Sequence, residues 1–218
     1  MKKNDNNLKK RIFTSLVLIF VFLLFFSSNF FLVYGLIVLG IFSVLEFLQL
    51  SKRIFKNNFT FLFLNIFFIS YIFLFCSIFT LFSYNIELKF ILFILLLGCI
   101  ASDIGGFIFG KLIKGPKLTS ISPNKTYAGC FGSIFFTIII VSTLFYYSLG
   151  FFNYNILLIG LVVSIFCQIG DLIFSYLKRK AKVKDTGNIL PGHGGVLDRL
   201  DGIFLGVPVS FLFLTLLH

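Results

Sequence analysis

The most polar segment of this otherwise apolar chain combines residue types suited to binding a metal ion and phosphate groups. Residues 175–202 read SYLKRKAKVKDTGNILPGHGGVLDRLDG. Asp198 and Asp201 are three residues apart, so on a helix they would share a face and present oxygens to a hard cation. Arg199 offers a guanidinium fork for phosphate. Glycines beside His193 would let backbone N–H groups approach an anion closely, as in a phosphate-binding nest. They are Gly192, Gly194 and Gly195.

A second polar segment, residues 111–129, supports this interpretation. It combines small hydroxyl residues, proline and four lysines, and Ser122 and Lys125 are candidates for contact with phosphate oxygens. Basic loops beside a membrane also attract anionic lipid headgroups, which would account for Lys180 and Lys182 in the first segment. Lipid attraction does not account for the Gly-His-Gly-Gly turn or for the spaced aspartates.

Acidic residues inside apolar runs are costly and therefore mark candidate sites. Asp103 and Asp171 each lie seven or eight residues before the next basic residue, which on a helix places them about 10–12 Å from the end of the apolar run. Asp198 and Asp201 approach the same boundary from the start of the last run, so we expect four aspartates to converge there. Glu46 has no motif around it, and we interpret it as a structural carboxylate paired with Lys or Arg between helices.

The composition shows what kind of chain must position these residues. Of its 218 residues, 58% are hydrophobic and 12% charged, with a mean hydropathy of +1.04. Soluble domains have about 45–50% apolar and 25% charged residues, so soluble enzymes, disordered tails and secreted disulfide scaffolds are excluded. The net charge of +11 is better explained by a membrane protein with basic cytoplasmic loops than by a nucleic-acid partner, and we expect no nucleic acid.

Seven apolar runs are candidates for membrane-spanning helices, which need about 20 residues each. Continuous runs without alternation favour helices over a β-barrel, so we predict an all-α polytopic integral membrane protein. The only plausible turn between the first two runs is Ser27–Asn29. The predicted spans are Ile12–Phe26, Phe30–Leu50, Phe59–Phe82, Ile86–Gly110, Cys130–Leu149, Ile156–Leu177 and Leu200–Leu217.

The distribution of basic residues predicts the orientation of these spans. All but one of the 19 lysines and arginines fall in residues 1–11, 51–58, 111–129 and 178–199. With seven spans these four segments lie on one side, and the positive-inside rule makes that side cytoplasmic. We therefore expect a cytoplasmic N-terminus, an external C-terminus and a site on the cytoplasmic face of the inner or plasma membrane.

The polar segments resemble the motifs of one enzyme family. The run SxxKRxxxxKDxGxxLPxHGGVxDRLD over residues 175–201 resembles the signature of phosphatidate cytidylyltransferases, also called CDP-diacylglycerol synthases. Residues 122–126 (SPNKT) resemble the second motif of that family, and residues 168–172 (QIGDL) resemble the stretch before its signature. Ala128 and Phe174 depart from the usual pattern, since acidic residues are common at both positions. We divide the chain into motif-free helices over residues 1–97 and a catalytic membrane region over residues 98–218.

The resemblance implies transfer of a cytidylyl group from CTP to phosphatidate, giving CDP-diacylglycerol and pyrophosphate, with Mg²⁺ as the metal and a homodimer as the assembly. It implies catalytic roles for Lys125 and His193; the imidazole either donates to phosphate or is structural. The implied metal ligands are Asp171 and Asp198, with help from Asp103 and Asp201. The implied substrate-binding residues are Ser122, Lys178, Arg179, Lys184, Gly194, Gly195 and Arg199.

Three alternatives belong to other classes. A CTP-dependent polyprenol or phytol kinase shares a similar PGHGGxxDRxD run, but the SxxKR start and the SPxKT loop favour the cytidylyltransferase. A transporter or lipid-binding membrane protein would have acidic residues at mid-bilayer and no glycine-rich phosphate turn. A CDP-alcohol phosphotransferase is disfavoured because its DxxDGxxAR signature is absent from the sequence.

Overall fold

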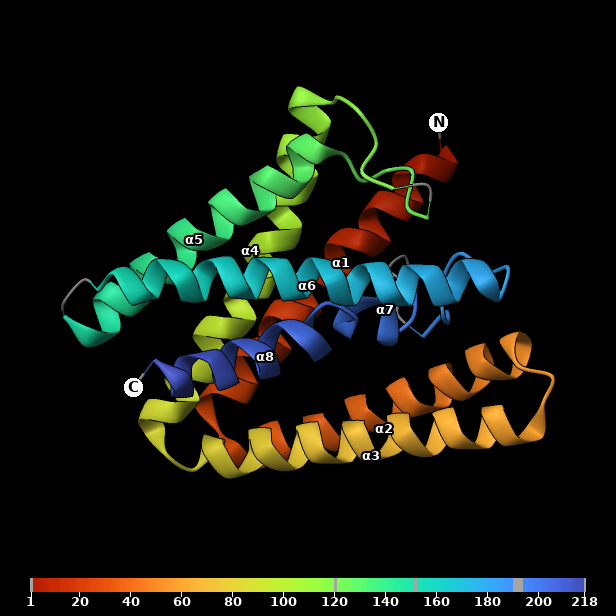
Figure 1. Ribbon diagram of the computed structural model, residues 1–218, viewed down its shortest axis with the longest axis horizontal. Coiled ribbons are helices and arrows are strands. Elements are labelled where there is room, and N and C mark those ends of the chain that lie inside the picture. The colour runs from red at the N-terminus through yellow and green to blue at the C-terminus, as the bar shows by residue number, and fades with distance from the viewer. Residues whose placement is uncertain (1, 120, 151–152, 190–193, 218) are drawn as a thin grey trace. The chain divides into compact units, whose positions relative to one another are not determined.

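The protein is built of α-helices joined by loops in the part that the structure, a computed structural model, describes (Figure 1). That part comprises residues 2–119, 121–150, 153–189 and 194–217. Side chains are described from residue 14 onward, except that of residue 149. Five of the helices, α2 to α6, and the stretch Leu197–Leu216, which contains α7 and α8, are long and apolar enough to cross a membrane; a shorter apolar stretch, Thr14–Ser27, precedes them. The predicted polytopic α-helical membrane protein is thereby confirmed. The helices are α1 (Lys2–Ser27), α2 (Asn29–Ile54), α3 (Asn58–Ser83), α4 (Ile86–Ile113), α5 (Tyr127–Leu149), α6 (Tyr154–Lys180), α7 (Leu197–Leu200) and α8 (Ile203–Leu216).

The predicted break between the first two helices is present. Ser28 has an extended backbone (φ −141°, ψ 129°) and separates α1 from α2. A single residue suffices, because Leu32 N donates to Ser28 O and the next helix starts at once (3.1 Å). Hydrophobicity continues across this junction, so only the Ser-Ser-Asn composition marks it.

The last predicted span is present over Leu197–Leu216 and contains a short turn near its start. The sequence predicts one helix from Leu200, but α7 ends at Leu200 and α8 begins only at Ile203. In the intervening turn the Asp201 carboxylate accepts a hydrogen bond from Gly202 N (2.9 Å). Asp198 therefore lies on α7 and Asp201 in the turn that follows it.

The described chain forms two compact units. Unit 1 comprises residues 1–85 and 177–200, and α2 and α3 pack against each other in it. These two helices run side by side as the orange and yellow ribbons of Figure 1. The rings of Phe47 and Phe68 stack with centroids 3.9 Å apart. Ser51 donates to the Asn65 side chain at 2.9 Å, so this buried polar pair is satisfied between the helices.

Unit 2 comprises residues 86–176 and 201–218, and α4 and α5 make its most extensive helix contact. Small residues allow their backbones to approach closely, as is common in membrane helices. A side chain at Gly105 would meet Gly132 O at 2.6 Å, and Ser133 donates to Ser102 O at 2.7 Å. This close packing fixes the ends of α4 and α5 that flank the SPNKT loop.

Candidate active site

Asp198 is the centre of a hydrogen-bonded cluster in unit 1, which we call the Asp198 cluster. Its Oδ1 accepts from Lys178 Nζ at 2.7 Å. Its Oδ2 accepts from Thr186 N (2.8 Å), Thr186 Oγ1 (3.0 Å) and Gly195 N (3.0 Å). The Lys178 and Asp198 side chains are only 11% and 6% exposed, so the ion pair is buried. Two signature residues, Lys178 and Gly195, and Thr186, which occupies a variable position of the signature, thus meet at the carboxylate of a third signature residue, up to 20 positions away in the sequence.

Local backbone geometry brings the ends of the signature segment together. After α6 the chain reverses at Lys182, which has a left-handed backbone (φ 57°), and Val183 N donates to Lys178 O at 3.0 Å. Gly194 also has a positive φ (85°), and a side chain there would approach Asp198 Oδ2 at 3.0 Å. Glycine is the residue that adopts such a conformation at least cost. The expected phosphate-binding nest therefore lacks one donor, because the Gly195 N–H group donates its hydrogen bond to Asp198.

Glu46 of α2 contacts the same segment. Its side chain is 2% exposed, and its carboxylate accepts from Val196 N (3.0 Å), Leu197 N (2.9 Å) and Thr186 Oγ1 (2.7 Å). These donors replace the lysine or arginine that the sequence analysis expected as its partner. Sequence reasoning missed Glu46 as a site residue. A signal was available, since Glu46 lies six residues before Lys52, much as Asp171 lies seven before Lys178.

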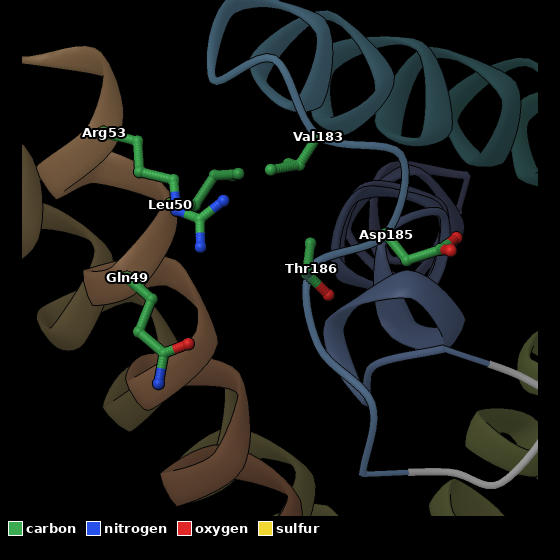
Figure 2. A pocket seen from close by; sticks show the side chains of 6 residues that line it. All are labelled: Gln49, Leu50, Arg53, Val183, Asp185 and Thr186. Atoms are coloured by element: carbon green, nitrogen blue, oxygen red, sulfur yellow. The ribbon is translucent and has the colours of Figure 1, made fainter.

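A small open hollow lies between the C-terminal part of α2 and the signature segment in unit 1 (Figure 2). Arg53 and Gln49 extend from α2 toward the segment, whereas the Asp185 carboxylate points away from α2 in this view. Beside it, the Lys180 ammonium lies 5.2 Å from the centre of the Phe55 ring, a cation–π contact that joins the ends of α6 and α2. Residues 46, 49, 50 and 53 recur at helical spacing, so one face of α2 borders the signature segment.

Unit 2 contains a second polar group, the Asp171 cluster. Lys125 forms an ion pair with Asp171 Oδ2, and Ser175 Oγ donates to Asp171 Oδ1 at 3.2 Å. The Lys125 and Asp171 side chains are 25% and 28% exposed, so both remain accessible. The structure therefore brings together a lysine from the SPNKT loop with an aspartate and a serine from α6, all predicted or motif residues.

The SPNKT loop is held in a defined shape at the start of α5. Leu118 N donates to Lys125 O at 2.8 Å, and Lys125 N donates to Ser122 O at 3.0 Å. Thr126 is the N-cap of α5, and its hydroxyl accepts from Gly129 N at 3.1 Å. Such a cap is worth about 1 kcal/mol to the helix. Lys125 is consequently fixed next to a helix start, with Ser122 in the same turn.

The other predicted site residues are distributed over both units. Asp103 is exposed on α4, whereas Asp201 is buried beside Gly202. Three basic residues of the predicted site are exposed in unit 1. They are Arg179, Lys184 and Arg199. His193 lies outside the described residues. Phe174, which replaces an acidic residue of the usual pattern, is buried and packs against Phe204 with ring centroids 6.5 Å apart.

The chemistry of these carboxylates fits a hard divalent cation, although no three of them are gathered in one place. Carboxylate oxygens are the ligands that Mg²⁺ prefers, and Asp198 Oδ1 and both Asp171 oxygens each accept one described bond, which leaves lone pairs for a cation. Within the described ranges, no group of three or more His, Cys, Asp or Glu side chains is placed to hold a metal ion. A lysine accompanies each of the two aspartates instead.

Comparison with known proteins decides the family. The model of the cytidylyltransferase family matches residues 1–217. The chain belongs to the cytidylyltransferase family. Three similar proteins are each named phosphatidate cytidylyltransferase: one from Staphylococcus haemolyticus strain JCSC1435 (43% identity over 110 residues), one from Staphylococcus aureus strain COL (44% over 112) and one from Staphylococcus epidermidis strain RP62A (43% over 124).

These matches confirm the resemblance to phosphatidate cytidylyltransferases that the sequence motifs indicated. The aligned stretches cover 50%, 50% and 56% of this chain, and 42%, 42% and 47% of the relatives. The chain thus spans less than half the length of the curated relatives it matches. Together with its apolar helices, the bacterial relatives identify the chain as an integral membrane protein.

Proposed function

We propose that this chain transfers the cytidylyl group of CTP to phosphatidate, forming CDP-diacylglycerol and pyrophosphate for phospholipid biosynthesis. The observation that carries the proposal is the Asp198 cluster, in which the signature residues Lys178 and Gly195, together with Thr186, donate to the carboxylate of the signature residue Asp198. The names of the relatives support it. The homodimer implied by the resemblance stays a prediction.

The proposed reaction asks the protein mainly to align charged groups. A phosphate oxygen of phosphatidate is already a nucleophile; it attacks the α-phosphorus of CTP, a new P–O bond forms, and the bond to pyrophosphate breaks. Charge neutralisation and in-line alignment then provide most of the rate enhancement. We assign phosphate contacts to the backbone at Gly194 and to six cationic or hydroxyl residues; the N–H of Gly195, which the resemblance also implies, donates to Asp198 instead. The six are Ser122, Lys125, Lys178, Arg179, Lys184 and Arg199.

We assign metal binding to the aspartates. In unit 1 we assign Asp198 to Mg²⁺ binding, and in unit 2 Asp171, with Asp103 and Asp201 as the further carboxylates that the resemblance implies. A bound cation would neutralise charge on the attacking and leaving oxygens. Lys178 and Lys125 hold the two principal carboxylates in place. The ammonium of each lysine lies beside an aspartate, where it reduces the repulsion between that carboxylate and the phosphate groups of the substrates.

The proposed site lies at the cytoplasmic face, because CTP is cytosolic and the basic segments predict that side. We expect a reporter inserted within residues 111–119 to report a cytoplasmic location, and one fused after His218 to report the outside. Alkaline phosphatase and green fluorescent protein fusions measure the two locations. A cytoplasmic reporter after His218 would show that the number of spans is even, with the junction at Ser28 as the first place to re-examine.

Lys125→Ala is expected to reduce cytidylyl transfer by roughly 10–100-fold, as loss of one charge-assisted phosphate contact does. The Lys125 side chain is 25% exposed and belongs to a loop fixed by backbone hydrogen bonds, so membrane insertion and thermal unfolding should not change. Initial rates and unfolding temperatures of the purified variant check this. Lys117→Ala, an exposed lysine in the same loop, is the matched control. Equal rates for Lys125→Ala and the wild type would limit the role of Lys125 to topology.

The proposed function is testable in cells. Expression of the chain in bacteria whose own phosphatidate cytidylyltransferase is repressed should restore growth and lower the phosphatidate content of the membranes. Failure to restore growth by a protein that is inserted and folded would contradict the proposal. Accumulation of a phosphorylated prenol instead would favour the CTP-dependent kinase.

A further inference from the structure

Glu46 provides a buried link between α2 and the signature segment that neither the motifs nor the proposed chemistry uses. Its carboxylate accepts three hydrogen bonds, two from the backbone at Val196 and Leu197 and one from Thr186 Oγ1. Burial of a carboxylate is costly unless hydrogen bonds compensate for lost hydration. Glu46 is 2% exposed, and all the described hydrogen bonds that compensate its carboxylate for lost hydration come from atoms of the signature segment.

The signature segment leaves space for this carboxylate. A side chain at Gly187 or Gly195 would overlap the Glu46 carboxylate oxygens. The signature glycine at 195 therefore does more than expose an N–H group: it leaves room for an acidic side chain that comes from α2, far earlier in the chain. Glycine at 187 has the same consequence on the other side of the carboxylate.

The link continues to Asp198 through Thr186. The Thr186 hydroxyl lies 2.7 Å from Glu46 Oε2 and 3.0 Å from Asp198 Oδ2. A hydroxyl has one proton, so it donates to one oxygen at a time, and the shorter distance favours Glu46. Donation to Glu46 orients Thr186, whose N–H then donates to Asp198 at 2.8 Å. The bonds from Val196 and Leu197 hold the first turn of α7, which carries Asp198.

We infer that Glu46 is a positioning residue for cytidylyl transfer: it fixes the signature segment so that Asp198 and Lys178 are held ready for the substrates. The inference rests on the proposed function, because the rate it affects is that of cytidylyl transfer. Glu46 does not itself contact substrate. Its loss should therefore lower kcat, which depends on alignment in the transition state, far more than it raises KM for CTP.

Glu46→Gln is the sharpest substitution, because it keeps the size of the side chain. An amide has one acceptor oxygen, so its NH₂ group must face either Val196 N–H or the two donors at Oε2, and at least one bond is lost. Thr186→Val removes the hydroxyl but leaves Glu46 with both backbone donors, and Thr186→Ser restores the hydroxyl. Ser51→Ala is the matched control: it removes a buried hydrogen bond from the same helix, to Asn65 of α3, away from the signature segment.

The experiment measures amide hydrogen exchange and kinetics on full-length protein in lipid vesicles. Glu46→Gln should speed exchange at Val196 or Leu197 about tenfold or more and lower kcat roughly 10–100-fold, the usual effect of losing a supporting partner, with KM for CTP within about threefold. Thr186→Val should lower kcat, and Thr186→Ser should recover most of it. Ser51→Ala should change neither exchange at these amides nor kcat.

The inference is overturned if Glu46→Gln leaves exchange at both amides unchanged, or if kcat falls only in proportion to the fraction of folded protein. It is also overturned if Ser51→Ala lowers kcat equally at equal stability. Absence of cytidylyl transfer in the wild type would refute the proposed function instead, and the exchange data would still decide whether Glu46 holds the segment.

Discussion

Asp198→Asn is expected to lower the rate of cytidylyl transfer about 10²–10³-fold, the usual cost of removing one electrostatic stabiliser from an active site. The substitution keeps the volume but removes the charge proposed to hold Mg²⁺. It also places an NH₂ group opposite Lys178 Nζ or the donors at Oδ2, so one side of the cluster loses its bonds. The measurement is kcat as a function of Mg²⁺ concentration, together with the unfolding temperature.

Dependence on Mg²⁺ separates the two roles of Asp198. As a metal ligand, its loss should raise the Mg²⁺ concentration needed for any residual rate. If Asp198 only holds the cluster together, its replacement should lower stability and leave the Mg²⁺ dependence of the rate unchanged. Asp185→Asn is the control: Asp185 is exposed in the same segment, so its effect should be milder. A near-normal rate for Asp198→Asn at ordinary Mg²⁺ would contradict the metal assignment.

Lys178→Met is expected to destabilise the protein by about 3–5 kcal/mol, because it leaves a buried carboxylate without its ionic partner. The two side chains are 11% and 6% exposed, so water can replace little of the lost interaction. Thermal or denaturant unfolding in detergent measures the change. The double substitution Lys178→Met with Asp198→Asn removes both charges, and it should recover most of the stability without recovering activity.

Recovery of stability in the double variant would show that Lys178 stabilises the protein through its buried ion pair, and does not act only by binding the substrate. A lysine that only binds phosphate would reduce affinity for CTP when replaced, with no change in unfolding and no recovery in the double variant. Arg179→Met, at an exposed neighbouring position, is a suitable control and should leave stability within about 0.5 kcal/mol. Equal stability of Lys178→Met and the wild type would show that the pair does not hold the cluster together.

The helices and most members of the site could be predicted because strong local signals mark them. Apolar runs of about 20 residues give the spans, and the SxxKR and SPNKT motifs identify Lys178 and Lys125. The pairing of each lysine with one particular aspartate could not be predicted. It depends on how α6 ends at Lys180 and how the loop before α5 folds, which are tertiary features.

Two features had no adequate sequence signal. The first is the turn at Asp201 and Gly202 within the last span, where a side chain on the glycine would meet Cys167 Sγ at 2.6 Å. The role of Glu46 depends on contacts with residues 140–151 positions later. A single sequence contains no signal that connects positions so far apart. The first three helices have no recognisable motif, and the contact between α2 and the signature segment therefore could not be predicted.

The most direct test of the proposed function is the fate of position-labelled CTP. Purified protein in vesicles containing phosphatidate is incubated with Mg²⁺ and CTP labelled at either the α- or the γ-phosphorus, and lipids are separated from soluble products. The account predicts that α-label enters a lipid that comigrates with CDP-diacylglycerol, while γ-label is released as pyrophosphate. Transfer of γ-label to a lipid, with α-label left in CDP, would show a CTP-dependent kinase and contradict the account.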